Sequence, residues 1–176
     1  MTVMGAINHI NAVKPNTYGQ SEKIKWLSNL DGIIKTEVID THESAPEFVK
    51  NESTGKLELY IFGIFRDSFE LTAEGGYKSA KTGIVCETEE KLQEMAWKAL
   101  KEPFKGYTDS SLMAEMLVPA PYDDIYIKWL EAQIDYANGE YAKYNNSISM
   151  YNAAYDAYAK WYNRTHMPIQ KEFTHF

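Results

Sequence analysis

The chain has 176 residues, a formal net charge of −7 at pH 7 and a 44% share of hydrophobic residues. This length suits one domain, or one domain with an insertion, and it is long enough to bury a core. An acidic chain is a poor candidate for gripping DNA or an anionic membrane, because phosphate binding needs clustered Lys and Arg. We also expect no membrane span, no signal peptide and no internal disulfide, since Cys86 is alone, and this fits a reducing cytoplasm.

Two helices are predicted in the N-terminal part of the chain. Residues 3–13 form a short helix that is stopped by Pro15. A longer helix runs from about 20 to 40, with Thr17 or Ser21 as its N-cap. The apolar face of this second helix is formed by Ile24, Leu27, Leu30, Ile34 and Val38.

The pattern changes after His42 from helix to strand. Residues 44–55 have the composition of a loop, which is rich in Pro, Asn, Ser and Gly. The next stretch, 56–66, is rich in aromatic and β-branched residues and predicts a strand. We expect two further short strands at 69–72 and 83–86.

A third helix follows these strands. Thr88 is its predicted N-cap, and the helix extends to about Lys101, with acidic residues in its first turn and basic residues in its last. Residues 46–104 are therefore expected to form a small α+β subdomain. It is inserted into a helical, connector-like core that comprises residues 1–45 and 105–176.

The C-terminal part carries the strongest pattern in the chain. Apolar and aromatic residues follow one another at intervals of three and four across 127–162, which is a heptad repeat along a helix. This helix begins at Asp123 or Asp124 and ends near Thr165. Gly139 can break it, but the continuous register favours one helix or two nearly collinear pieces. We therefore expect a mainly α fold of long helices packed as a bundle, with the small α+β insertion.

The second half of this repeat is mostly tyrosine. Tyrosine has an apolar ring and a polar hydroxyl, and it therefore suits contacts that are partly wet, such as subunit interfaces. An aromatic stripe at helical spacing is also typical of a core. Both interpretations remain open for these residues, which we call the tyrosine seam: Tyr141, Tyr144, Tyr151, Tyr155, Tyr158 and Tyr162.

Motifs for catalysis, metal binding and phosphate binding do not stand out in the sequence. His42 with Asp40 and Glu43 is a weak metal-ligand set, and a solvated helix end explains it better. Residues 74–79 lack the spacing of a phosphate loop and favour a hairpin turn. Cys86 lies in an apolar stretch and is interpreted as a buried structural thiol. We therefore assign no catalytic residue, cofactor or metal.

Two segments resemble a known family. Residues 121–168 include the phrases PYDDIY, DYANGEYAKYNN and WYNRTHMP, and they resemble the C-terminal part of head-to-tail connector, or adaptor, proteins of tailed phages and prophages of Gram-positive bacteria. Residues 6–43 resemble the N-terminal part of the same proteins. The two segments cover roughly half of the chain, and residues 46–104 are longer than the short loop expected between them.

The resemblance implies a non-enzymatic virion structural protein, whose mostly helical subunits form a ring below the portal and bridge capsid to tail. Its implied partners are the portal protein and the next tail-completion protein. The resemblance also implies that double-stranded DNA passes through during packaging without specific binding, and that no membrane is involved. The implied location is the portal vertex, or neck, of the virion, and the host cytoplasm before assembly. Expected portal contacts lie at the end of the long helix: Trp161, Asn163, Arg164, His166 and Met167.

Two other functions remain open at this point. The first is a soluble α+β enzyme, or a regulatory or binding domain, carried by residues 46–104. Three or more polar side chains that converge in a pocket of the insertion would favour it. The second is a helical module that binds a host protein as a monomer through the face between Tyr136 and Tyr162.

Overall fold

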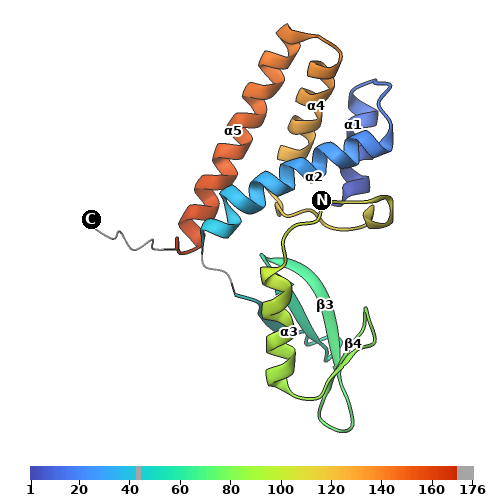
Figure 1. Ribbon diagram of the computed structural model, residues 1–176, viewed down its shortest axis with the longest axis vertical. Helices are drawn as coiled ribbons and strands as arrows, with labels where there is room; N and C mark the ends of the chain where they lie inside the picture. Colours follow the sequence, from blue (N-terminus) through green and yellow to red (C-terminus); the bar gives the residue numbers. More distant parts are fainter. Residues whose placement is uncertain (43–44, 170–176) are drawn as a thin grey trace, which may run out of the picture. The chain divides into compact units, whose positions relative to one another are not determined.

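The computed structural model describes residues 1–42 and 45–169 of the chain. The chain divides into two compact units, which Figure 1 shows with their helices and strands. The helical unit comprises residues 1–43 and 104–176, and the sheet unit comprises residues 44–103. Among the described residues, five α-helices and one antiparallel sheet make the chain an α+β protein.

Four α-helices form the helical unit. They are α1 (Val3–Val13), α2 (Gln20–Glu37), α4 (Ile125–Ala137) and α5 (Tyr141–Thr165), and short 3₁₀ turns lie at Ile39–Thr41 and Asp109–Ser111. The helices predicted at 3–13 and at about 20–40 are confirmed. The predicted caps Thr17 and Ser21 are wrong, because the N-cap of α2 is Gly19, which makes no side-chain cap hydrogen bond.

The N-terminal helix α1 is fixed at its start by local capping and by pairing. The Thr2 hydroxyl accepts a hydrogen bond from the Gly5 N–H at 3.1 Å, which satisfies one of the free donors of the first turn. Thr2 also pairs with Glu115 in an antiparallel bridge. The 112–118 segment therefore lies against the start of the chain, and both border the core of the unit.

The predicted single or collinear C-terminal helix is wrong, because α4 and α5 form an antiparallel hairpin (Figure 1). The chain reverses at Gly139, whose φ of 71° is the left-handed conformation that glycine adopts at little cost. The ring of Trp129 lies 4.9 Å from that of Tyr151, and the ring of Tyr122 lies 5.1 Å from that of Trp161. The repeat spacing of three and four continues through the turn because each helix buries an apolar face against the other.

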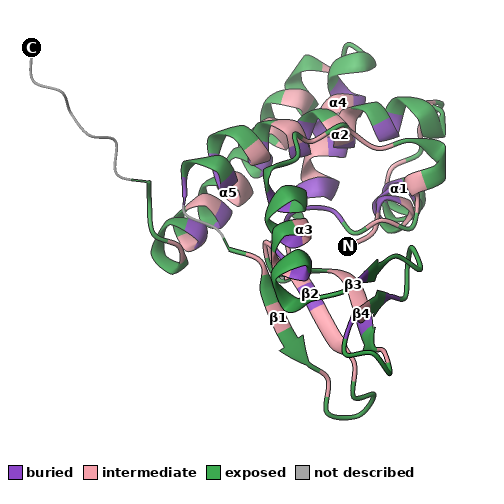
Figure 2. Ribbon diagram, turned by 60° about the horizontal axis from the view of Figure 1, so that its bottom comes forward, coloured by how far each residue is buried: buried purple, intermediate pink, exposed green. Residues whose placement is uncertain are grey.

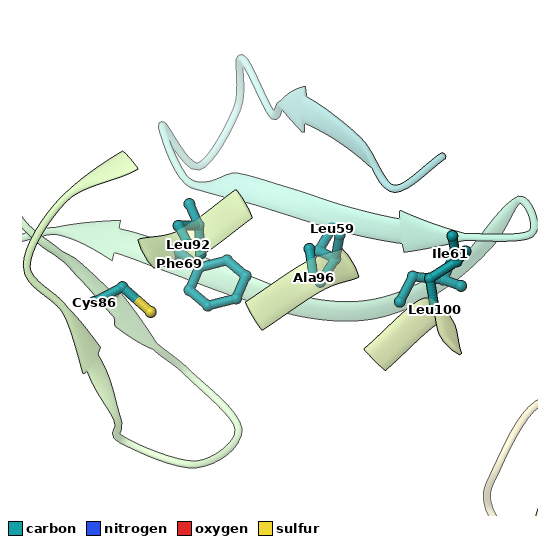
Figure 3. Packing of buried hydrophobic residues seen from close by; sticks show 7 residues of the cluster. All are labelled: Leu59, Ile61, Phe69, Cys86, Leu92, Ala96 and Leu100. Carbon is teal, nitrogen blue, oxygen red and sulfur yellow. The ribbon is translucent and has the colours of Figure 1, made fainter. Parts of the chain in front are cut away.

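The sheet unit is a five-stranded antiparallel meander with one helix on it. Its strands lie in the order β1 (Glu47–Lys50), β2 (Leu57–Ile61), β3 (Ile64–Leu71), β4 (Tyr77–Ser79) and β5 (Val85–Cys86), and α3 (Glu89–Lys101) follows. Figure 3 shows α3 packed over the sheet, and Figure 2 shows that only one stripe of this helix is buried. The core residues are Leu59, Ile61, Phe69, Cys86, Leu92, Ala96 and Leu100.

Several strand predictions need correction. Residues 44–55 were expected to be a loop, but they contain strand β1. The stretch 56–66 was expected to be one strand, but it turns back at Phe62 and Gly63, whose φ angles of 57° and 72° are those of a tight hairpin turn. The apolar run continues through this turn, and it therefore hides the reversal. Strand β4 was not predicted.

Other predictions for the sheet unit are confirmed. Residues 74–76 form a turn, and strand β5 lies within the predicted 83–86. The Thr88 hydroxyl accepts a hydrogen bond from the Lys91 N–H at 3.3 Å at the start of α3. Cys86 is buried, as expected of a structural thiol.

The hairpin turn gives a stability prediction. Replacing Gly139 with Ala places a Cβ in the left-handed conformation, and we expect the free energy of unfolding to fall by about 1 kcal/mol in urea titrations. Gly32→Ala is the matched control, because Gly32 lies inside α2 and its new Cβ meets only Phe104 at 3.9 Å. This control is expected to raise stability by about 0.5–1 kcal/mol. Equal effects of the two substitutions would contradict the hairpin geometry.

Candidate functional site

The tyrosine seam divides between the interior and the surface of the helical unit. Tyr151, Tyr158 and Tyr162 are buried, Tyr144 and Tyr155 are half-buried, and Tyr141 is exposed. Tyr151 contacts Trp129 of α4, and Tyr158 contacts Tyr122 just before α4. The half-buried Tyr155 donates a hydrogen bond to Glu37 of α2 at 2.8 Å. Much of the seam therefore serves helix packing within one subunit.

Burial also sets the ionisation of these phenols. Removal from water raises the pKa of Tyr151 to about 12, and the Glu37 carboxylate adds to the shift. The pKa of Tyr158 is raised further, first by burial and then by the neighbouring Tyr162. These hydroxyl groups stay neutral throughout the ordinary pH range, and the seam contributes no charge to the core.

The C-terminal end of α5 carries a cluster of stacked rings, which we call the aromatic end. Trp161 stacks on Tyr122 at 5.1 Å, and His166 stacks on Tyr162 at 3.8 Å with an interplanar angle of 5°. The rings of His42 and Tyr162 also form a T-shaped contact, with their centroids 5.2 Å apart. The aromatic end therefore joins the last turns of α5 to residues before α4 and after α2.

The predicted portal contacts do not all lie together. Trp161 and His166 are half-buried in the aromatic end. The side chains of Asn163 and Arg164 are exposed on the last turn of α5, and Met167 is 70% exposed just beyond it. Two of the five predicted contacts are thus part of a ring cluster, and the other three face outward beside it.

The prediction for His42 as a solvated helix end is wrong. His42 is buried, and its Nδ1 lies 2.8 Å from the Val38 carbonyl oxygen. Asp40 pairs instead with Lys35, and Glu43 lies outside the described residues. Within the described part of the chain no group of three or more His, Cys, Asp or Glu side chains is placed to hold a metal ion.

One exposed surface of α5 was not predicted from the sequence. From Tyr144 to Tyr155 the helix carries no charged side chain, although Lys143 and Asp156 border this stretch. The residues exposed along it are small or neutral, and we call them the α5 face: Asn145, Asn146, Ser149, Met150, Asn152 and Ala153. The signal in the sequence was a gap in the charge pattern, which the aromatic repeat overshadowed.

A buried carboxylate organises the interior behind these surfaces. Asp31 of α2 is fully buried, and its Oδ1 accepts a hydrogen bond from the Tyr126 hydroxyl at 2.6 Å. Its Oδ2 accepts from the Leu117 N–H at 3.2 Å and from the Tyr107 hydroxyl. The Tyr126 hydroxyl in turn accepts from the Val118 N–H at 2.8 Å. We call these groups the Asp31 cluster, and sequence reasoning did not find it.

A second buried carboxylate lies in the α4–α5 hairpin. Asp135 accepts hydrogen bonds from the Lys14 ammonium and from the Ser147 hydroxyl, both at 2.5 Å. Burial alone would raise the pKa of Asp135, but these two bonds and the charge of Lys14 outweigh it, and the pKa lies below its usual range. Asp135 therefore ties α1 and α5 to the end of α4.

One group of polar side chains in the sheet unit stabilises a turn. Ser79 donates a hydrogen bond to Asp67 at 2.5 Å, and its hydroxyl oxygen accepts from the Thr82 N–H at 2.9 Å. The Lys81 N–H also bonds to Asp67, at 3.1 Å. Because these groups bond to one another and to the backbone between β4 and β5, their arrangement is that of a structured turn.

Searches for similar proteins complete the description. No protein-family model, no curated protein and no solved structure matches this chain. Among the described helices none is long and apolar enough to cross a bilayer.

The Asp31 cluster gives a direct mutational test. Tyr126→Phe removes the hydroxyl that bonds both Asp31 and the Val118 N–H, and we expect a loss of about 1.5–3 kcal/mol in the free energy of unfolding. Tyr136→Phe is the control, because Tyr136 is 60% exposed and a change within about 0.5 kcal/mol is expected. If the two variants unfold at the same urea concentration, the hydrogen bond between Tyr126 and Asp31 does not stabilise the fold as described.

Asp135 gives a pH-dependent test. Because its pKa is lower in the folded state, its stabilising effect is complete above the unfolded value of about 3.9 and is lost as the pH falls through the folded value. The difference in unfolding free energy between wild type and Asp135→Asn should be constant above about pH 5 and should shrink below about pH 4.

The matched control for this pH test is Asp156→Asn, because Asp156 is exposed and pairs across one helix turn with Lys160. Little change is expected at any pH in this control. A wild-type advantage over Asp135→Asn that persists unchanged into acid would show that the Lys14–Asp135 pair does not act as described.

Proposed function

We propose that this chain is a non-enzymatic structural protein of the virion, a head-to-tail connector whose helical unit assembles into a ring below the portal. The proposal rests on the resemblance of residues 121–168 and 6–43 to that family, and on the α5 face. In this proposal the α1, α2, α4 and α5 helices act as the connector-like bundle. The sheet unit is an addition to it.

The α5 face carries the proposal because its composition is that of an interface core. Charged residues are depleted in the centres of protein interfaces, where methionine and aromatic residues are enriched. The stretch from Tyr144 to Tyr155 extends for about three helical turns without a charge, in a chain of which 24% is charged. Its short side chains, such as Ser149 and Ala153, allow a neighbouring helix to approach closely.

A closed ring needs two different faces on each subunit. We place the second face on the outward side of α2, where Asn29 and Ile33 are exposed and Ile33 leaves 37% of its surface accessible. The inner side of α2 contributes Asp31 to the Asp31 cluster, and α5 is held by α4. The two proposed faces therefore belong to one rigidly connected set of helices.

The portal contact is proposed at the end of α5. Asn163, Arg164 and Met167 are exposed there, next to the stacked rings of Trp161 and His166. A partner that docks on this end would contact the guanidinium group of Arg164, the amide of Asn163 and the thioether of Met167. These groups lie beside the stacked rings. The next tail-completion protein would then bind elsewhere on the ring. Passing double-stranded DNA would meet an acidic chain that has little tendency to retain it.

The alternative of an enzyme on the sheet unit gains no support from the polar groups of the turn between β4 and β5. Asp67, Ser79 and Thr82 satisfy one another and the turn between β4 and β5. A helical module that binds a host protein as a monomer would use the same α5 face. The oligomeric state of the bound form separates that function from a connector.

The α5 face can be tested with a single charge. Ala153→Arg should weaken assembly on the portal by at least about tenfold, because it buries a charge without a partner, while the melting temperature and circular dichroism stay unchanged. Sedimentation velocity of the protein with and without assembled portal measures the effect. Ala99→Arg is the matched control, since Ala99 is an exposed alanine of α3 and its variant should assemble like wild type.

Two outcomes would contradict the proposed face. In the first, Ala153→Arg assembles as well as wild type. In the second, its melting temperature falls in proportion to the loss of assembly, so that unfolding rather than lost contact explains the result.

A further inference from the structure

The helical unit contains a polar hollow between α1 and the start of α2. Its lining includes the amide side chains of Asn8, Asn11, Asn16 and Gln20 together with Lys23. The hollow is independent of the α5 face and of the aromatic end, because none of its lining residues belongs to α4 or α5.

Lys23 is the unusual member of this lining. It is 2% exposed, which is rare for a lysine. Its ammonium group donates hydrogen bonds to the Asn11 side-chain oxygen at 2.8 Å and to the Tyr18 carbonyl oxygen at 2.5 Å. Both acceptors are neutral, and within the described part of the chain no carboxylate forms an ion pair with Lys23.

A buried cation without a counter-charge is costly. Burial lowers the pKa of Lys23, and only the charge of Glu22 opposes this shift. Buried charges in proteins are usually paired with an opposite charge. An ammonium group has three N–H donors, and two of those of Lys23 are accounted for by Asn11 and Tyr18. One donor and one positive charge therefore remain for a group that enters the hollow.

Two further features of the hollow favour an anion. Asn11 accepts from Lys23 through its oxygen, which leaves its NH₂ group as a donor. Helix α2 begins at Gln20, and its N-cap residue Gly19 supplies no side-chain acceptor to the N–H groups of the first turn. These donors can form further hydrogen bonds with an anion, but the buried charge of Lys23 remains the main reason to expect one.

We propose that this hollow binds a carboxylate group. The lining carries one positive charge, with Glu22 close enough to act on it, and a monoanion therefore fits better than a phosphate dianion. The two oxygens of a carboxylate match the ammonium of Lys23 and the NH₂ group of Asn11. Two sources share this chemistry: a free small acid, or an Asp or Glu side chain of a bound protein.

The test is an NMR titration of the ¹⁵N-labelled full chain. Sodium acetate should shift the backbone amides of Gln20 and Ser21 in a saturable way, whereas sodium chloride at equal ionic strength should not. Sodium phosphate should bind at least about tenfold more weakly than acetate. Equal shifts with acetate and chloride, or shifts that do not saturate with acetate, would overturn the proposal. This result needs only the wild-type protein.

Variants then assign the binding to Lys23. Lys23→Met should lose the saturable shift, and Lys25→Met, which removes an exposed lysine two residues along α2, should keep it. If Lys23→Met fails to fold, the acetate titration of wild type decides alone. Blocked aspartate and glutamate, as N-acetyl amides, separate the two sources. If the blocked residues bind as tightly as acetate, the natural source is an Asp or Glu side chain of a bound protein. If they do not bind in the hollow, the source is a free small acid.

Discussion

The helical unit depends on the buried carboxylate of Asp31. Residues 112–118 are irregular, and residues 116–118 are buried in the interior, where unsatisfied backbone N–H groups are costly. Asp31 accepts the N–H of Leu117, and Tyr126, which Asp31 also binds, accepts the N–H of Val118. This arrangement fixes α2 against α4. Because α5 packs on α4, the position of every surface on α5 follows from the same interaction.

The elements that were predicted correctly are those with local causes. Helices α1 and α3 begin at threonine caps and are followed closely by prolines. Helices α1, α2 and α3 each show one apolar stripe. The α4–α5 hairpin was missed because an interval of three or four residues looks the same on both sides of Gly139. The turn at Phe62 and Gly63 was missed for the same kind of reason, since its flanks are apolar on both sides.

The interior polar groups lay beyond sequence reasoning because their partners are distant in the chain. Asp31 meets Tyr107, Leu117 and Tyr126 at separations of 76, 86 and 95 residues. An aspartate inside an amphipathic helix is normally read as a solvated residue. The tyrosine seam was visible as a pattern, but its division into core and surface follows from the hairpin. The charge gap of the α5 face was visible too, and its exposure required the structure.

These features describe a rigid helical scaffold with an uncharged face, an aromatic end and an added sheet unit. The proposed connector function is tested most directly by co-sedimentation of the full chain with assembled portal protein of the phage or prophage proposed to encode it, followed by negative-stain imaging. We predict saturable binding and a ring of this protein on the portal. Folded protein that stays free at every portal concentration would contradict the connector function.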